Sequence, residues 1–223
     1  MVERIIAIPG MVIGGKEYTG GDNTVRTEKG WIATRLGVTS INGRRISVIP
    51  YAGPYKPRQG DFVIGIVQGY GPNGWFLDIS TPSKAFLPAT EVLGKRRFDP
   101  RIDELRDILK IGDVVSAKVL ETGRFGHTIL TMKDRGLEKI EKGYFLKVGI
   151  QKIPRIIGKK GSMLKILQEG SGSSIAIGQN GVIAVKGSYE AFLKVKSAID
   201  LIEKKTFARG LTEEVASVLG LRS

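Results

Sequence analysis

The chain has 223 residues, 41% of them hydrophobic and 7% aromatic, and its 30 glycines suggest several small, turn-rich domains rather than one thick core. It contains no cysteine and a single histidine, His127. These counts exclude thiol catalysis, disulfides, zinc ribbons and Ser-His-Asp triads, so we expect no catalytic residues and no bound metal or cofactor.

Basic residues outnumber acidic residues by 35 to 22, which gives a net charge of +13. Residues 1–54 and 55–136 carry +3 each, and residues 137–223 carry +7. Such a surplus attracts nucleic acid or acidic membrane. No apolar run reaches the roughly 18 residues of a membrane span, and Glu3 and Pro9 interrupt the short apolar start. We therefore expect a cytoplasmic protein that does not associate with membranes and binds a polyanion mainly through its last third.

The first segment, residues 1–54, alternates short β-prone runs with glycine turns. Within it, residues 31–49 are typical of two strands around an Asn42-Gly43 hairpin. A stretch rich in Pro and Gly, residues 51–61, follows and indicates a boundary. These features predict an N-terminal β-rich domain over residues 1–54.

Residues 55–136 contain five more β-prone runs, with a short helical segment at 99–109 before the fourth. Asp103 is placed to cap that segment. Five strands with such an insertion are typical of an OB-type barrel, which we predict for residues 55–136. The five runs are 62–68, 74–79, 85–88, 113–121 and 128–132.

After Gly136 the pattern changes to mixed α and β. It predicts, in order, a strand at 144–151, a short apolar turn, a helix at 162–169, strands at 174–178 and 181–187, a long helix at 188–207 capped by Ser188, and a short helix at 212–219. The fold class predicted for the whole chain is therefore multidomain, mainly β plus α+β.

The most specific signal is Gly158-Lys159-Lys160-Gly161, which follows Ile156-Ile157 and opens a helix. Glycines let backbone pass close to phosphates, a helix N-terminus offers unpaired N–H groups, and two lysines add positive charge. This loop and the order of elements around it resemble the KH domain, whose G-x-x-G loop clamps a few single-stranded nucleotides. The resemblance implies a KH domain over residues 137–223 with RNA-binding residues Ile157, Gly158, Lys159, Lys160, Gly161 and Lys165.

A second glycine pair, Gly178-Gln179-Asn180-Gly181, has the same spacing but joins two strands. Asn-Gly suits the backbone of a tight hairpin. We interpret this second pair as a structural turn rather than as a binding loop.

The middle segment resembles the OB-fold RNA-binding domain repeated in the largest protein of the bacterial small ribosomal subunit, through residues 60–67, 74–79 and 111–120. Such barrels present base-stacking aromatics on strands two and three. Phe76 matches one of them, whereas Asn73 replaces a second aromatic and Pro88 replaces a histidine. We therefore expect an eroded stacking platform, with His127 as a surface or loop residue. Phosphate contacts would come from Lys84, Arg96, Arg97 and Arg124.

The order of modules, a β-rich unit, an OB barrel and one KH domain, resembles the RNA-binding cap subunit of the archaeal exosome over essentially the whole chain. The resemblance implies a non-catalytic subunit, three copies of which sit on a hexameric ring of phosphorolytic nuclease subunits. It implies that residues 1–54 hold the ring, the barrels surround the entry pore, and the KH domain captures single-stranded RNA whose 3′ end is guided inward.

Two other interpretations remain open at this point. A free-standing RNA-binding regulator of translation or transcription would use the same two modules without a ring. A hydrolytic nuclease would need a metal site, and the only acidic cluster, Asp99, Asp103, Glu104 and Asp107, is more typical of a short solvated helix.

Overall fold

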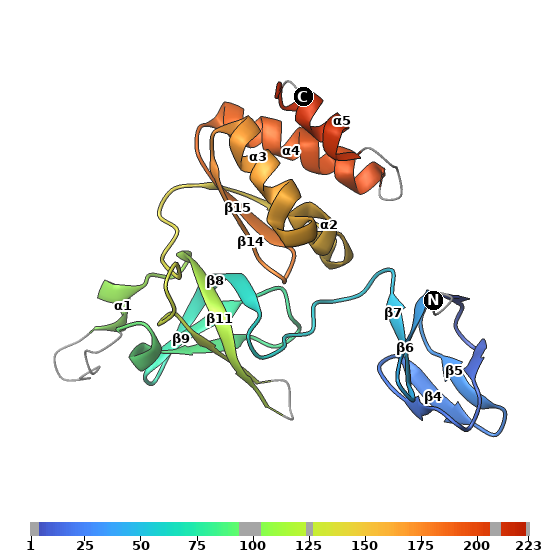
Figure 1. Ribbon diagram of the computed structural model, residues 1–223. Helices are drawn as coiled ribbons and strands as arrows, with labels where there is room; N and C mark the ends of the chain where they lie inside the picture. Colours follow the sequence, from blue (N-terminus) through green and yellow to red (C-terminus); the bar gives the residue numbers. More distant parts are fainter. Residues whose placement is uncertain (1–4, 94–103, 124–126, 206–210, 222–223) are drawn as a thin grey trace. The chain divides into compact units, whose positions relative to one another are not determined.

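The computed structural model describes residues 5–93, 104–123, 127–205 and 211–221. The chain forms two compact units, Met1–Gly53 and Pro54–Ser223, and Figure 1 shows the elements of each. The fold class is multidomain and mainly β, with helices concentrated towards the C-terminus, as the sequence predicts.

The N-terminal unit consists of seven short strands in two small sheets. One sheet has the order β1-β6-β7-β3 and the other has the order β2-β5-β4. Their buried centre is small and includes Ala7, Ala33 and Val48. The strands are β1 (Ile6–Ala7), β2 (Val12–Gly14), β3 (Thr19–Gly20), β4 (Thr24–Thr27), β5 (Gly30–Ala33), β6 (Gly37–Asn42) and β7 (Arg45–Pro50).

The expected hairpin is confirmed, because β6 and β7 pair antiparallel with Asn42 opposite Arg45. Gly43 begins the two-residue connection with a φ of 58°, a conformation that glycine adopts without steric cost. The start of the predicted segment differs, since Trp31 belongs to β5 in the other sheet. There the indole N–H of Trp31 donates to the Tyr18 carbonyl at 2.8 Å.

The five predicted barrel strands are confirmed and close in the order β10-β12-β11-β8-β9, with the parallel pair β10 and β12 completing the circle. This is the strand arrangement of an OB fold. The inward side chains are apolar, and Trp75 at their centre donates its indole N–H to the Leu109 carbonyl at 3.1 Å. The strands are β8 (Phe62–Gly71), β9 (Gly74–Asp78), β10 (Ala85–Pro88), β11 (Val114–Thr122) and β12 (Thr128–Thr131).

The helical insertion before the fourth strand is also present, as α1 (Leu105–Ile108). A 3-10 turn, η1 (Ala89–Glu91), follows β10. Glu104 precedes α1 without a side-chain capping bond, and Asp103, the expected cap, lies outside the described residues. Glu104 and Asp107 are both exposed, as expected for a solvated helix.

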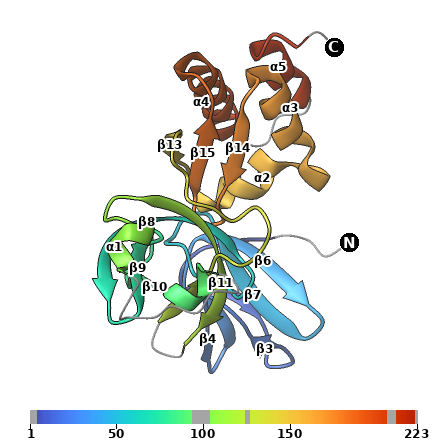
Figure 2. The ribbon, with the colours of Figure 1, turned by 90° about the vertical axis from the view of Figure 1, so that its left-hand side faces the viewer.

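The C-terminal part contains a three-stranded antiparallel sheet of order β13-β15-β14, with helices α2, α3 and α4 in the order expected for a KH domain. Figure 2 shows β13 and α4 on one side of this part and α2 and α3 on the other. Its elements are β13 (Tyr144–Lys147), η2 (Ile150–Lys152), α2 (Ile153–Ile157), η3 (Lys159–Gly161), α3 (Ser162–Ser171), β14 (Ser174–Ile177), β15 (Val182–Lys186), α4 (Tyr189–Lys204) and α5 (Leu211–Val218).

Two local expectations in this part have different outcomes. The Ser188 cap is confirmed, because its hydroxyl accepts a hydrogen bond from the Ala191 N–H at 3.2 Å. The predicted strand 144–151 is too long, because the chain leaves the sheet after Lys147 and turns into η2. The alternation of apolar and polar residues continues into that turn. It therefore could not show that pairing with the neighbouring strand ends at Lys147.

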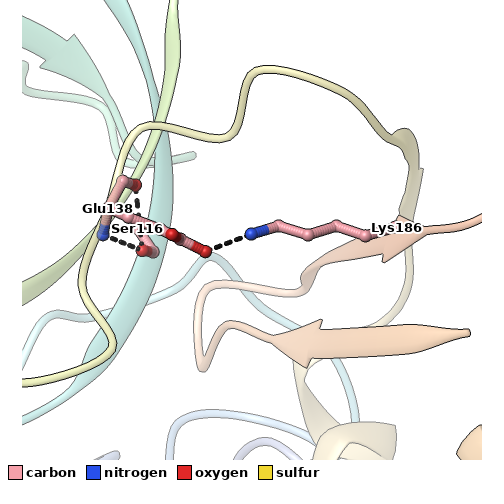
Figure 3. Close-up of polar contacts among 3 residues, drawn as sticks. All are labelled: Ser116, Glu138 and Lys186. Atoms are coloured by element: carbon pink, nitrogen blue, oxygen red, sulfur yellow. Dashed lines mark hydrogen bonds and ion pairs between the residues drawn. The ribbon is translucent and has the colours of Figure 1, made fainter.

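The KH sheet packs against the barrel within Pro54–Ser223. Ile64 of β8, Ile140 of the connecting segment and Ala184 of β15 are buried together. Figure 3 shows the polar part of this junction: the Ser116 hydroxyl donates to the Glu138 carbonyl and accepts from the Glu138 N–H, and the Glu138 carboxylate pairs with Lys186. The connecting segment therefore contacts the barrel and the KH sheet at once.

Candidate nucleic-acid interface

The loop Gly158–Gly161 has the backbone that its sequence requires. Gly158 has φ 76°, and a Cβ there would lie 2.6 Å from the Met163 nitrogen, so only glycine fits. Lys160 and Gly161 also have positive φ, at 54° and 80°. The chain thus makes a sharp turn between α2 and α3 that only a glycine-bracketed sequence forms without strain.

The chemistry of this turn is that of an anion-binding surface. Lys159 and Lys160 are both exposed, and α3 begins at Ser162 without a side-chain cap. The first N–H groups of a helix have no partner within the helix and carry partial positive charge. Two exposed lysines therefore lie at the start of α3, where the Ser162 N–H donates to the Lys159 carbonyl and the N–H groups that follow carry the partial positive charge.

The other predicted residues of the KH domain lie around this turn. Ile157 is half-buried and packs against the KH core, while Ile156 is fully buried. Lys165 is exposed on α3, one turn from the loop, and makes a weak ion pair with Glu169 at 3.6 Å. The structure brings these residues together because they are neighbours along two short helices.

The barrel face keeps more aromatic surface than the sequence suggests. Phe76 on β9 is 36% exposed, and Phe86 lies directly opposite it on β10. Their ring centroids are 5.3 Å apart at an angle of 52°, and a Cβ at Gly71 would lie 3.0 Å from the Phe86 ring and 3.2 Å from the Phe76 ring. The expectation of an eroded platform missed Phe86; the alternation of residues 85–88 could have indicated that this side chain points outward, but not that it lies beside Phe76.

The remaining predicted barrel residues are only partly placed. Lys84 is exposed at the start of β10. Arg96, Arg97 and Arg124 lie outside the described residues. Asn73 is exposed in the β8–β9 turn, and His127 is an exposed loop residue before β12, as expected.

The second glycine pair has a role that sequence reasoning did not find. Asn180 is 1% exposed, and its side-chain amide donates to the carbonyls of Ile64 and Ile79 at 2.7 and 3.1 Å. Its side-chain oxygen accepts from the Ile64 N–H at 3.3 Å. The loop Gly178–Gly181 is therefore structural, as expected, but it holds the KH sheet to the barrel in addition to joining two strands.

Clusters of metal ligands and membrane-spanning helices are both absent from the described ranges. Across these residues, no group of three or more His, Asp or Glu side chains is placed to hold a metal ion. No helix within the same ranges is long and apolar enough to cross a bilayer.

A closed OB barrel followed by a KH domain defines a class of proteins built from two nucleic-acid-binding folds. The family model of the KH domain matches residues 145–204. The exosome complex component Rrp4 of Nitrosopumilus maritimus is 36% identical, covering 97% of this chain and 96% of its own length. The Rrp4 of Thermosphaera aggregans is 43% identical over 84% of this chain and 76% of its own length.

A solved structure agrees with these relatives. It is the crystal structure of a protein described as an exosome complex RNA-binding protein, with a TM-score of 0.69 and 33% identity, covering 75% of this chain and 96% of that one. The chain therefore belongs to the family of the exosome complex component Rrp4.

Proposed function

We propose that this chain is a non-catalytic RNA-binding subunit of the exosome, which captures single-stranded RNA and guides its 3′ end towards a ring of nuclease subunits. The observation that carries the proposal is the Gly158–Gly161 turn, with two exposed lysines at the start of α3 that have no ion pair among the described residues. Membership of the Rrp4 family supports the same function.

In this proposal the KH domain, residues 137–223, binds the phosphates of RNA at Gly158–Gly161, with Ile157 and Lys165 beside it. The barrel, residues 55–136, adds a stacking contact at Phe76 and Phe86 and a phosphate contact at Lys84. Because these phosphate contacts do not read bases, affinity would come with little sequence preference. Three copies on one ring would strengthen weak contacts through avidity.

The N-terminal unit offers a surface for the ring. Ile6 of β1 and Ile49 of β7 both lie opposite Val38 of β6, so the three side chains share one face of the sheet. Ile6 is 58% exposed and Ile49 is 59% exposed, which is unusual for two neighbouring isoleucines on a small β unit. We infer that residues 1–54 hold the chain on the nuclease ring through this apolar face.

Co-purification with untagged nuclease ring subunits, followed by mass measurement of the intact complex, tests the function. We expect a six-membered ring carrying three copies of this chain. The double substitution Ile6→Glu with Ile49→Glu is expected to abolish ring binding and to leave RNA binding of the free chain intact. Val25→Glu is the matched control, because Val25 is 50% exposed on the other sheet.

Deleting Met1–Gly53 is likewise expected to abolish ring binding and to keep RNA binding, since this segment is a compact unit by itself. A wild-type chain that binds RNA, stays monomeric and ignores the ring would contradict the proposal. It would favour a free-standing RNA-binding regulator instead.

A further inference from the structure

Three aromatic rings gather where the start of α4 meets β13. The centroid of Tyr144 lies 5.5 Å from that of Tyr189 and 5.1 Å from that of Phe192, and those of Tyr189 and Phe192 are 6.2 Å apart. Phe192 is nearly parallel to both tyrosines, at 27° and 29°. We refer to Tyr144, Tyr189 and Phe192 as the aromatic cluster.

Packing of the KH core does not account for the whole cluster. Phe192 is half-buried and contacts the core, but Tyr189 is 57% exposed and Tyr144 is 37% exposed. Neither tyrosine hydroxyl makes a hydrogen bond to any residue in the described ranges. Tyr189 therefore presents a ring face to solvent that no described part of the chain uses.

Two exposed lysines, Lys142 and Lys196, lie near these rings along the chain. Lys142 precedes Tyr144 by two residues, and Lys196 follows Phe192 by one helical turn on the same side of α4. Both lysines are exposed, and neither has an ion pair among the described residues. Of the acidic neighbours, Glu141 is exposed next to Lys142 in the chain without pairing to it among the described residues. Glu190 points about 100° around the helix from Tyr189. Asp200 lies one turn beyond Lys196 without pairing to it within those ranges.

The cluster is separate from the Gly158–Gly161 turn. It lies at β13, whereas α3 packs beside β14, the strand at the opposite edge of the sheet. Figure 2 shows the same separation, with α4 and β13 on one side of the KH domain and α2 and α3 on the other. A ligand held at both places would have to extend across the domain.

We propose that the aromatic cluster is a second contact for single-stranded RNA, in which a base stacks on the exposed face of Tyr189 while Lys142 and Lys196 hold the adjoining phosphates. This inference rests on the proposed RNA-binding function. Exposed rings between unpaired lysines have the chemistry of a single-strand stacking platform. A protein partner would be expected to use more aliphatic surface, and Leu193 is the only exposed large aliphatic side chain of α4 in the described ranges.

The test uses the full chain with two RNA probes, a tetranucleotide and a longer single-stranded oligouridine. A G-x-x-G loop clamps about four nucleotides, so the tetranucleotide reports on that loop alone. We expect Tyr189→Ser to weaken binding of the long probe about fivefold or more, because one lost stack has that effect, and to leave the tetranucleotide unchanged. Tyr189→Phe keeps the ring and is expected to keep the affinity.

Leu193→Ala is the matched control, since it removes exposed apolar surface from the same helix without removing a ring. A second measurement, photo-crosslinking with 4-thiouridine in the long probe, is expected to label Tyr144 or Tyr189. Unchanged affinity of Tyr189→Ser together with no crosslink at the cluster would overturn this inference and leave the proposed function standing. If the wild-type chain did not bind the tetranucleotide at all, that result would instead contradict the proposed function.

Discussion

Two loops of the KH domain share the spacing G-x-x-G, but one lies at the surface and the other is buried against the barrel. Gly158–Gly161 exposes two lysines at the start of a helix. Gly178–Gly181 joins two strands and buries Asn180 against the barrel. The glycines provide the turn in both loops, so the difference comes from the residues between them and from the elements on either side.

The residues between the glycines decide whether such a loop lies at the surface or inside the protein. A lysine cannot be buried without a partner, because its desolvation is too costly, so a pair of lysines keeps a turn at the surface. An asparagine side chain has both donors and an acceptor, so it can satisfy backbone groups of another element inside the protein. Here the pairing of β8 with β9 ends with Ile66 opposite Asp78. Just beyond that end, Asn180 forms hydrogen bonds with backbone groups of Ile64 and Ile79.

The largest effect is expected from Asn180→Ala. This change removes three hydrogen bonds and leaves the N–H and carbonyl of Ile64 and the carbonyl of Ile79 without their buried partner. We expect the free energy of unfolding to fall by about 2–4 kcal/mol, measured by urea denaturation. Gln179→Ala is the control, because Gln179 is exposed and bonds the barrel only through its backbone. Equal stability of the two variants would show that the loop does not hold the barrel.

Giving the exposed loop the central residues of the buried loop is expected to have the next largest effect. Lys159→Gln with Lys160→Asn places the residues of the buried loop in the exposed one. Asn tolerates the φ of 54° at position 160, so the free energy of unfolding is expected to change by less than about 0.5 kcal/mol. RNA affinity is expected to fall about tenfold at low salt, because two phosphate contacts lose their charge. Retained affinity would mean that the glycine turn alone binds RNA.

The smallest effect concerns Asp113, which pairs with Lys139 of the connecting segment at 2.8 Å and accepts from the Lys110 N–H at 2.7 Å. Burial alone would raise the pKa of Asp113, but these bonds and the nearby lysine charges lower it overall. A folded-state pKa below the unfolded value gives stability that is present above about pH 4 and is lost as the pH falls further.

The corresponding variant is Asp113→Asn. At neutral pH it is expected to be less stable than the wild type by about 1 kcal/mol or less, and the two should converge as the pH falls below about 4. Denaturation curves across this range measure the difference. Asn180 is uncharged, so the stability difference between Asn180→Ala and the wild type should stay the same as the pH falls. A constant difference between Asp113→Asn and the wild type at every pH would contradict this account of the ion pair.

The sequence predicted the elements well because their signals are local. Short β-prone runs marked the barrel strands, and the glycines and lysines of residues 158–161 specify a turn and its exposure within a few residues. These signals depend only on near neighbours in the chain. The secondary structure and the candidate loop could therefore be predicted without the structure.

Long-range partners could not be predicted in the same way. Asn180 is 116 residues from Ile64, and Tyr144 meets Tyr189 only when β13 lies beside α4. Periodicity shows that a side chain is buried or exposed but not what it contacts. Phe86 was missed for the same reason, since its contact with Phe76 depends on the register of β9 and β10.

The central claim is that the lysines at the exposed G-x-x-G turn hold the phosphates of single-stranded RNA, and a salt series of RNA binding tests it most directly. The test variant is the double substitution Lys159→Asp and Lys160→Asp. The control is the double substitution Lys16→Asp and Lys29→Asp, which alters the net charge equally at exposed positions of the N-terminal unit. Each phosphate contact contributes about 0.7 to the slope of log affinity against log salt, so the first variant should lose about 1.4 and the second almost nothing. Identical slopes for the wild type and the variant at residues 159 and 160 would contradict the account.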